Sequence, residues 1–391
     1  MPTPIVDGRA GGRADDLDDA LSQRVIAIAR RAGLDAVGLA TAEPFDVARC
    51  ALEERKAAGL HGGMHFTYGN PARSTDPERA LVGARSLVVG ASSYRREQPD
   101  APRQGGPWAR VARYSWADRY EPLRVALGAV AACLTDAGWQ ARVLVDDNAL
   151  VDRAAAVRAG VGWYGKNANV LVPGVGSWFV LGSVVTDAPL VPSTVDEALA
   201  DGCGSCTRCL PACPTGALVA PGVLDARRCL AWLLEAPGPF PREYRAALGD
   251  RLYGCDDCQE ACPPNRLLDR TIVALGPSPG DEPWVDVVEL LDASDTELMD
   301  RFGRWYIPRR EPRYLRRNAL VVLGNAGEQA AASPSVTHAL RVSLVSDDSL
   351  VRSHAVWAAH RLGRADLIAE TMAGECDPEV LDELRFAGSA P

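Results

Sequence analysis

The chain has 391 residues, of which 47% are hydrophobic and 24% charged, and its net charge is −9. This length predicts two or three domains, and the negative balance argues against a protein that coats nucleic acid uniformly, although not against a local basic patch. No apolar run approaches the ~20 residues that span a bilayer, and residues 1–20 lack the apolar centre of a secretory signal. We therefore expect a cytoplasmic protein without a membrane segment.

The first half of the chain alternates patterns typical of helices and strands. Residues 1–16 are rich in Gly, Ala and Asp and are expected to be disordered. The alternation predicts an N-terminal α/β layer domain over residues 17–192. Apolar periodicity places its helices over 17–33, 45–59, 120–138 and 149–159, and its strands over 36–40, 86–90, 142–145 and 178–186, with a loop over 95–107.

Eight of the eleven cysteines fall between Cys203 and Cys262. The first four form a C-x2-C-x2-C-x3-C-P run, a pattern of bacterial iron–sulfur proteins, in which the fourth cysteine ligates the other cluster. The pattern returns at the end of the segment with one cysteine displaced upstream, to Cys229, while Leu252 stands near the usual position. We predict a ferredoxin-like domain over residues 193–275 with two [4Fe-4S] clusters. The first would take Cys203, Cys206, Cys209 and Cys262, and the second Cys213, Cys229, Cys255 and Cys258.

The main alternative for these cysteines is a zinc site or a set of structural thiols. Zinc sites usually show paired C-x2-C knuckles, whereas this chain has four cysteines in one run followed by proline. The remaining cysteines, Cys50, Cys133 and Cys376, lie in helical patterns and are expected to be buried packing residues.

A Pro- and Gly-rich linker over residues 276–283 precedes a helical region over 284–391. The segments that begin at Leu315 and Val351 are similar and lie 36 residues apart, which is weak evidence for HEAT-like repeats. Between Arg301 and Arg317 there are seven arginines and one acid, with Trp305, Tyr306 and Tyr314 interleaved. This composition suits contacts with phosphates and unpaired bases, while the alternative is a solvated or salt-bridged helix face.

Several motifs in order along the chain resemble the epoxyqueuosine reductase family. They extend from about Gly63 to Asn325, and the most specific contain the cysteines themselves. The motifs are Cys203-Gly-Ser-Cys-Thr-Arg-Cys, Leu224-Asp-Ala-Arg-Arg-Cys229, Tyr253-Gly-Cys-Asp-Asp-Cys-Gln259, Gly162-Trp-Tyr-Gly-Lys-Asn167, Gly176-Ser-Trp-Phe179 and Val145-Asp146.

The resemblance implies an oxidoreductase that uses cobalamin and two [4Fe-4S] clusters to reduce epoxyqueuosine to queuosine at the wobble position of tRNA. It also implies a cobalamin-binding N-terminal domain and a C-terminal HEAT-like domain that helps to hold the anticodon stem-loop. We further expect a monomer that receives electrons from a donor such as a flavodoxin or a ferredoxin. Two other functions stay open: a corrinoid reductase acting on a small molecule, and a non-catalytic iron–sulfur electron carrier.

Site residues follow from the same resemblance. Asp146 matches the proton donor of the family, although an aspartate here could simply cap a helix that starts near Ala149, as could Asp147. The expected cofactor contacts, each with a solvated surface residue as the alternative, are Arg73, Asp146, Lys166, Asn167, Ser177, Trp178, Asp256 and Asp257. The expected tRNA contacts are Arg227, Arg228, Arg309, Arg310, Arg313, Arg316 and Arg317. The chain departs from the family pattern at Arg119, Glu121, Ala231 and Pro264.

Overall fold

The computed structural model describes residues 11–66, 68–174, 176–194, 202–266 and 276–389. Its N-terminal part is built on a four-stranded sheet with the strand order β1-β2-β7-β4. The strands are β1 (Ala36–Thr41), β2 (Ser86–Ser93), β4 (Ala141–Val145) and β7 (Phe179–Thr186), so all four predicted strands are present. All neighbouring pairs in this sheet are antiparallel. Strands and helices alternate along the chain as expected, and of the two predicted classes, α+β and α/β, the antiparallel pairing is typical of α+β.

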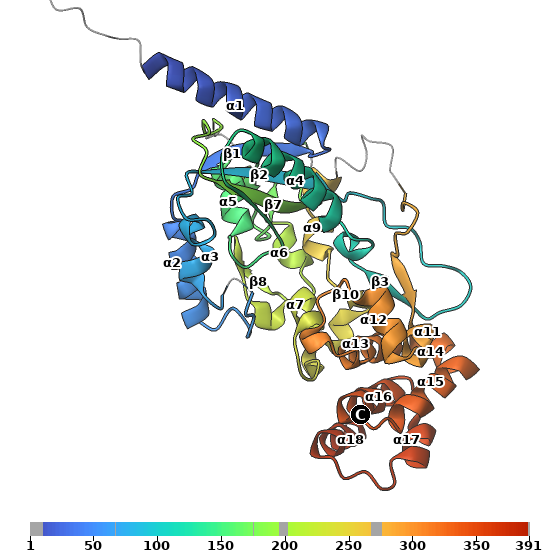
Figure 1. Ribbon diagram of the computed structural model, residues 1–391. Helices are drawn as coiled ribbons and strands as arrows, with labels where there is room; N and C mark the ends of the chain where they lie inside the picture. Colours follow the sequence, from blue (N-terminus) through green and yellow to red (C-terminus); the bar gives the residue numbers. More distant parts are fainter. Residues whose placement is uncertain (1–10, 67, 175, 195–201, 267–275, 390–391) are drawn as a thin grey trace, which may run out of the picture.

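Helices cover both faces of this sheet (Figure 1). Helices α1 (Gly11–Arg31) and α4 (Tyr120–Asp136) pack on one face, and α5 (Asp152–Arg158) packs on the other. Side chains alternate along a strand, so Val88 joins the α1–α4 core, whereas Leu87 and Val89 join the α5 core. Burying each such side chain contributes about 1.5–3 kcal/mol.

Two expectations are corrected, one about the N-terminal residues and one about the three cysteines outside the clustered segment. Helix α1 begins at Gly11, so residues 11–16 are helical and not disordered, while residues 1–10 lie outside the described part. Helix α2 (Asp46–Ala57) has no buried residue, and its Cys50 is exposed. Cys376 is exposed too, and only Cys133 is a buried packing residue, with its Sγ 3.1 Å from Arg24 Nε.

A second sheet connects the three predicted domains. Strand β3 (Trp108–Val111) pairs with β10 (Arg251–Tyr253) in parallel and with β11 (Trp284–Asp286) in antiparallel fashion. The predicted domain boundaries therefore do not separate independent units, because each of the three segments supplies one strand.

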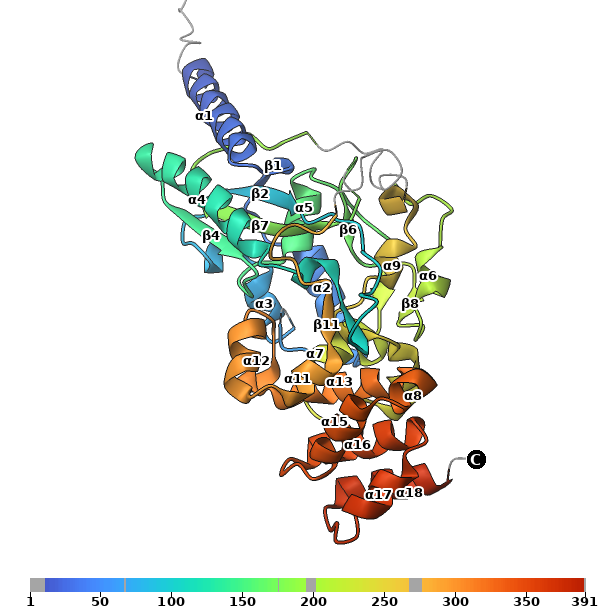
Figure 2. The same ribbon diagram turned by 90° about the vertical axis from the view of Figure 1, so that its right-hand side faces the viewer.

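Short elements surround the cysteines between the two sheets. They are α3 (Pro71–Ser74), β5 (Trp163–Tyr164), β6 (Val170–Leu171), α6 (Cys209–Ala212), β8 (Leu218–Ala220), β9 (Val223–Leu224), α7 (Leu230–Glu235), α8 (Arg242–Leu248) and α9 (Asp257–Glu260), with 3₁₀ turns over Pro77–Arg79, Arg113–Ser115, Ala226–Arg228 and Pro308–Arg310. Figures 1 and 2 place α6 and α9 between the N-terminal sheet and the C-terminal helices.

The C-terminal region is helical, as predicted. Its helices are α11 (Val287–Asp292), α12 (Asp295–Phe302), α13 (Arg313–Gly324), α14 (Gly327–Ala331), α15 (Pro334–Leu344), α16 (Ser349–Arg361), α17 (Ala365–Thr371) and α18 (Pro378–Ser389). They share one hydrophobic core with α7 and β10. The two similar segments lie on α13 and α16, which pack together, and their assignment as HEAT-like repeats stays a prediction. No helix in the described residues has the length and apolar character of a membrane span.

Candidate functional site

The four cysteines expected at the first cluster line one cavity. Cys203, Cys206, Cys209 and Cys262 surround it together with Lys166, Asn167, Leu171 and Pro263. The pKa of the Cys262 thiol is raised to about 11, chiefly by burial and in part by the other three thiols, which therefore lie close to it. The last cysteine of the second run therefore crosses to the first run, as the reciprocal arrangement requires.

The other four cysteines form a second group. Burial raises the pKa of Cys258, and the nearby thiols of Cys229 and Cys213 add to the shift. Burial likewise raises the pKa of Cys255, to which the Cys229 thiol contributes. Cys209 of the first set also acts on Cys258, so the two groups are neighbours.

The displaced position of Cys229 has a structural reason. Leu252, near the usual cysteine position, is fully buried in β10 and belongs to the large C-terminal core. Cys229 is instead the N-cap residue of α7, and this helix carries Leu230, Leu233 and Leu234 into the same core. The thiol is thus held by a packed helix rather than by the strand.

Both groups of thiols fit iron–sulfur clusters by their donor chemistry. Among the residues described, no three His, Cys, Asp or Glu side chains are arranged around a single metal-ion position. The first set instead borders a space that Asn167 also lines, and the buried amide nitrogen of this residue, Nδ2, has no hydrogen-bond partner in the described structure. A group with sulfur acceptors satisfies both the thiols and this donor, and the thiols lose their protons when metal binds.

We expect Cys229→Ser to halve the iron content, because the second set would lose the ligand supplied by α7 while the first set stays intact. Iron analysis and electron paramagnetic resonance (EPR) of the reduced, reconstituted protein measure the result. Cys133→Ser is the matched control, since Cys133 is buried in α4 outside both sets, and it should keep all the iron. Equal iron content in the two variants would refute the second ligand set.

Asp146 follows the last residue of β4 in an uncommon backbone conformation. Its φ is +53°, a region that costs a non-glycine residue about 1–3 kcal/mol and recurs at active sites. The residue is exposed at the surface. Nevertheless the burial of its surroundings raises the pKa of its carboxyl group, while Arg124 lowers this pKa and Asp147 raises it. Asp146 thus holds its proton to a higher pH than an ordinary aspartate does.

Neither Asp146 nor Asp147 caps the following helix. Helix α5 begins at Asp152, three residues later than predicted, and its N-cap residue is Val151, which makes no side-chain cap hydrogen bond. Asp147 Oδ1 accepts a hydrogen bond from Ala149 N at 2.8 Å and so stabilises the turn before the helix.

Further acids near Asp146 gave no signal in the sequence. Burial raises the pKa of Glu235 to about 7, and the charge of Asp146 contributes. Glu235 Oε1 accepts a hydrogen bond from the Tyr114 hydroxyl at 3.0 Å. Burial also raises the pKa of Asp152 to about 8, again with a contribution from Asp146. Glu235 and Tyr114 come from segments distant from Asp146 in sequence, so no local motif could have revealed their proximity.

Four of the predicted cofactor contacts are buried or line the cavity of the first thiol set. Ser177 and Trp178 are buried, at 4% and 2% exposed, respectively. The Ser177 hydroxyl accepts from Asn265 Nδ2 at 2.8 Å, and the Trp178 ring lies 4.4 Å from the Arg113 guanidinium carbon. Lys166 and Asn167 face the first thiol set. These four side chains do not form one exposed surface for a large cofactor.

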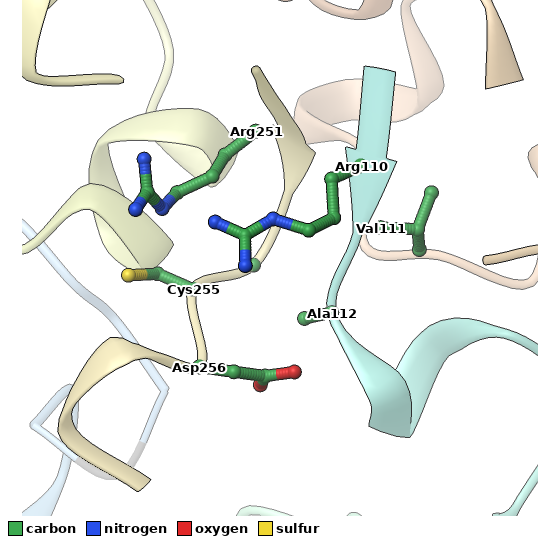
Figure 3. A pocket seen from close by; sticks show the side chains of 7 residues that line it. Arg110, Val111, Ala112, Arg251, Cys255 and Asp256 are labelled. Atoms are coloured by element: carbon green, nitrogen blue, oxygen red, sulfur yellow. The ribbon is translucent and has the colours of Figure 1, made fainter. Parts of the chain in front are cut away.

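Asp256 and Asp257 are engaged beside the second thiol set. Asp256 is buried and accepts from Arg113 N at 2.9 Å, and burial raises its pKa to about 6. Asp257 pairs with Arg251 at 2.8 Å. Figure 3 shows Arg251 and Arg110 side by side above Cys255 and Asp256, in a small pocket between β10 and β3. Of the predicted contacts, Arg73 and Asp146 keep exposed side chains.

The predicted tRNA-binding arginines divide into two groups. Arg309 and Arg310 are exposed next to Tyr306, which is 58% exposed, and both have positive φ angles of 52° and 57°. Arg227 is exposed too, although Asp225 pairs with it at 2.8 Å, and Arg228 is half-buried.

The other three arginines serve the fold. Arg313 and Arg316 form ion pairs with Asp348 and Asp295. Arg317 is completely buried, and its guanidinium donates to the carbonyl oxygens of Leu233, Leu234, Ala236 and Gly238. Its prediction as a tRNA contact is wrong, because its position on α13 turns it toward the C-terminal end of α7.

Comparisons with known proteins agree with this arrangement. The family described as "4Fe-4S double cluster binding domain" matches residues 202–265. An epoxyqueuosine reductase from Bacillus anthracis is 34% identical over 93% of this chain and 96% of its own length. An epoxyqueuosine reductase from Xanthomonas campestris is 35% identical over 90% of this chain and 98% of its own length.

Solved structures give the same result. A crystal structure of epoxyqueuosine reductase with an epoxyqueuosine-modified tRNA-Tyr stem loop superposes with a TM-score of 0.84, at 31% identity, over 94% of this chain and 98% of that one. The Bacillus subtilis enzyme, with an aspartate-bearing catalytic loop swung out of its active site, gives a TM-score of 0.82 at 31% identity over the same shares. The chain therefore belongs to the epoxyqueuosine reductase family of oxidoreductases, and it contains a double [4Fe-4S] cluster domain.

Proposed function

We propose that this chain reduces the epoxide of epoxyqueuosine in tRNA to the alkene of queuosine. The reaction consumes two electrons and two protons and releases the epoxide oxygen as water. The observation that carries the proposal is Asp146, an exposed carboxyl group with a raised pKa in a chain that also holds two groups of four thiols. A site that supplies protons to a centre reduced by clusters needs both features.

The relation of the thiol groups to Asp146 supports an order for electron transfer. Cys209 of the first set contributes to the raised pKa of Cys258 in the second set. In the same way, Glu235 contributes to the raised pKa of Cys229, and Asp146 to that of Glu235. The second set is therefore the one nearer to Asp146, which supports entry of electrons from a flavodoxin or ferredoxin at the side of the first set. Cobalamin, which Asp146 and Arg73 would hold, would supply the electron pair that opens the epoxide.

This chain's own residues control the proton. Opening the epoxide leaves an alkoxide, which becomes a good leaving group only when it is protonated. Asp146 is exposed for donation, and its carboxyl group is biased toward the neutral form by its surroundings. Exposed Arg73 and Asp146 are the predicted contacts that remain available to hold the cofactor.

The function is tested by incubating the reconstituted full chain with epoxyqueuosine-containing tRNA, cobalamin and a strong reductant, followed by nucleoside analysis. We expect queuosine to replace epoxyqueuosine. If a verified relative forms queuosine under these conditions while this chain does not, the proposed function is wrong. Retention of the cluster signals without any affinity for corrinoid would instead favour a non-catalytic electron carrier.

We expect the turnover rate to fall as pH rises, because Asp146 must be protonated to donate. Since burial raises its pKa, the fall should begin above the value of about 4 that is ordinary for an aspartate. Asp147→Asn removes a negative neighbour, so the falling limb should move to lower pH, whereas Arg124→Gln removes a positive neighbour and should move it to higher pH. Single-turnover rates across pH measure both shifts, and shifts of the same sign would exclude Asp146 as the titrating group.

A tRNA surface formed by Arg309, Arg310 and Tyr306 is the second part of the proposal. In the described structure Arg309 has no hydrogen bond or ion pair through its side chain, so it is available to a phosphate. We expect Arg309→Gln to weaken tRNA binding and to lower the slope of log affinity against log salt concentration by about one. Arg341→Gln is the control, because Arg341 is exposed but already paired with Glu370. An unchanged salt slope in Arg309→Gln would remove this residue from the interface.

A further inference from the structure

A tight turn between β5 and β6 forms one wall of the cavity that the first thiol set lines. Gly165 N donates to Asn169 O at 2.7 Å, and Ala168 N donates to Gly165 O at 3.0 Å. A Cβ atom at Gly165 would lie 2.2 Å from Leu171 Cδ1 and 2.6 Å from Asn167 Oδ1. A larger residue at this position would displace the side chains of Leu171 and Asn167, so glycine allows Asn167 to keep its place in the turn.

The orientation of the Asn167 amide follows from one hydrogen bond. Its Oδ1 accepts from Asn169 N at 3.2 Å, and an amide NH₂ group could not take that role. The opposite end, Nδ2, is therefore the donor, and it is buried without a partner in the described structure. Leaving a buried donor unpaired costs about 1–3 kcal/mol, so a built position of this kind calls for an acceptor.

The residues that line the cavity indicate which acceptor Asn167 would meet. Asn167 and four cysteines line the same space, and the other polar lining residue, Lys166, already donates to Gly204 O. The indole N–H of Trp163 also lacks a partner, but Trp163 is not among the lining residues. The acceptor that suits Asn167 is consequently a sulfur atom of whatever the thiols hold.

We infer that Asn167 Nδ2 donates a hydrogen bond to a sulfur atom of the first [4Fe-4S] cluster and thereby raises its reduction potential. The inference rests on the proposed ligand set of that cluster. A hydrogen bond to sulfur stabilises the reduced cluster, which carries one more negative charge, more than the oxidised one. Asn167 is thus a positioning residue for the electron and not a contact to the corrin, and it makes the first cluster easier to reduce than it would be without this hydrogen bond.

The test is a redox titration of the reconstituted full chain, followed by EPR. Asn167→Asp keeps the acceptor for Asn169 N but lacks the donor, and Asn167→Leu lacks the donor without adding charge. We expect each variant to lower the reduced-to-oxidised ratio of the first cluster at least tenfold at a fixed potential, which corresponds to 59 mV for one electron. Asn169→Ala, in the same turn, retains its backbone N–H and should leave both potentials unchanged.

Three outcomes would overturn the inference. The first is an unchanged first-cluster potential in Asn167→Leu, because a shift in Asn167→Asp alone would then be an effect of charge. The second is an equal shift in both clusters. The third outcome concerns the wild-type chain, so it applies even where a variant loses iron. Labelling of asparagine side chains with ¹⁵N should give a ¹⁵N coupling in the pulsed EPR spectrum of the reduced cluster. Absence of this coupling would refute the hydrogen bond.

The inference can fail separately from the proposed function. A missing ¹⁵N coupling together with normal queuosine formation would remove only the hydrogen bond. A shifted potential without queuosine formation would support the hydrogen bond and contradict the proposed substrate.

Discussion

Exchange of Asp146 for asparagine is expected to lower the rate of epoxide reduction by about 10²–10⁴-fold, the usual contribution of a general acid. Asparagine has nearly the same shape and is the residue type that best tolerates the positive φ of +53° found here. It cannot release a proton, however, so the alkoxide would have to take one from water. Single-turnover formation of queuosine, with the iron content and the cluster spectra as controls, measures the effect.

A matched variant distinguishes the role of Asp146 as an acid from the effect of the adjacent carboxylate. Asp147→Asn changes the adjacent carboxylate but preserves the hydrogen bond to Ala149 N, because asparagine also has an Oδ1 acceptor. It should keep the rate within about tenfold of wild type at the optimum of its own pH profile. If Asp146→Asn retains full activity with both clusters present, another group donates the proton, and Glu235 and Asp152 would be the next to exchange because of their raised pKa values of about 7 and about 8.

Exchange of Arg317 for leucine is expected to destabilise the protein by about 3–5 kcal/mol, which is the range for removing one partner of a buried charged network. Burial lowers the pKa of Arg317 to about 9, and the side chain is still charged at neutral pH. Its guanidinium donates to four carbonyl oxygens at and beyond the end of α7. Leucine would leave the carbonyl oxygens of Leu233, Ala236 and Gly238 without this donor, at about 1–3 kcal/mol each before relaxation, whereas Leu234 O still accepts from Asn318 Nδ2.

The same substitution should affect the second cluster. Helix α7 has Cys229 as its N-cap residue and is held at its other end by Arg317, so loosening that end should release the ligand. Urea unfolding and iron analysis measure the two effects. Arg341→Leu is the control, because the exposed pair with Glu370 contributes about 0–1 kcal/mol. A loss of stability no larger than that of the control would show that α7 does not depend on Arg317.

Local patterns determined much of this protein. The period of apolar residues located all four strands of the N-terminal sheet and most of the helices, because burial on one face imposes that period. The cysteine spacing predicted a double iron–sulfur domain, since a cubic cluster accepts thiolates only at certain separations along a turn. The displaced Cys229 was identified by its neighbours in sequence, and the structure shows it held at the start of α7.

Other properties depend on which segments meet, and no local pattern contains that information. In the N-terminal sheet, β2 and β7 pair in antiparallel fashion although more than eighty residues separate them. The second sheet joins strands from segments that were expected in three domains. Seven arginines between Arg301 and Arg317 look alike in sequence. Packing turns Arg317 inward to satisfy carbonyl groups and leaves Arg309 in solvent.

Asn167 shows the same division at a single residue. The sequence determined that a Gly-flanked turn would present an amide, since glycine at position 165 leaves room for the side chains of Leu171 and Asn167. Only the tertiary structure decided what this amide faces: Cys262, almost one hundred residues further along the chain, lines the same cavity. A turn can be encoded by its own residues, but the partner of a buried donor is chosen by packing between distant segments.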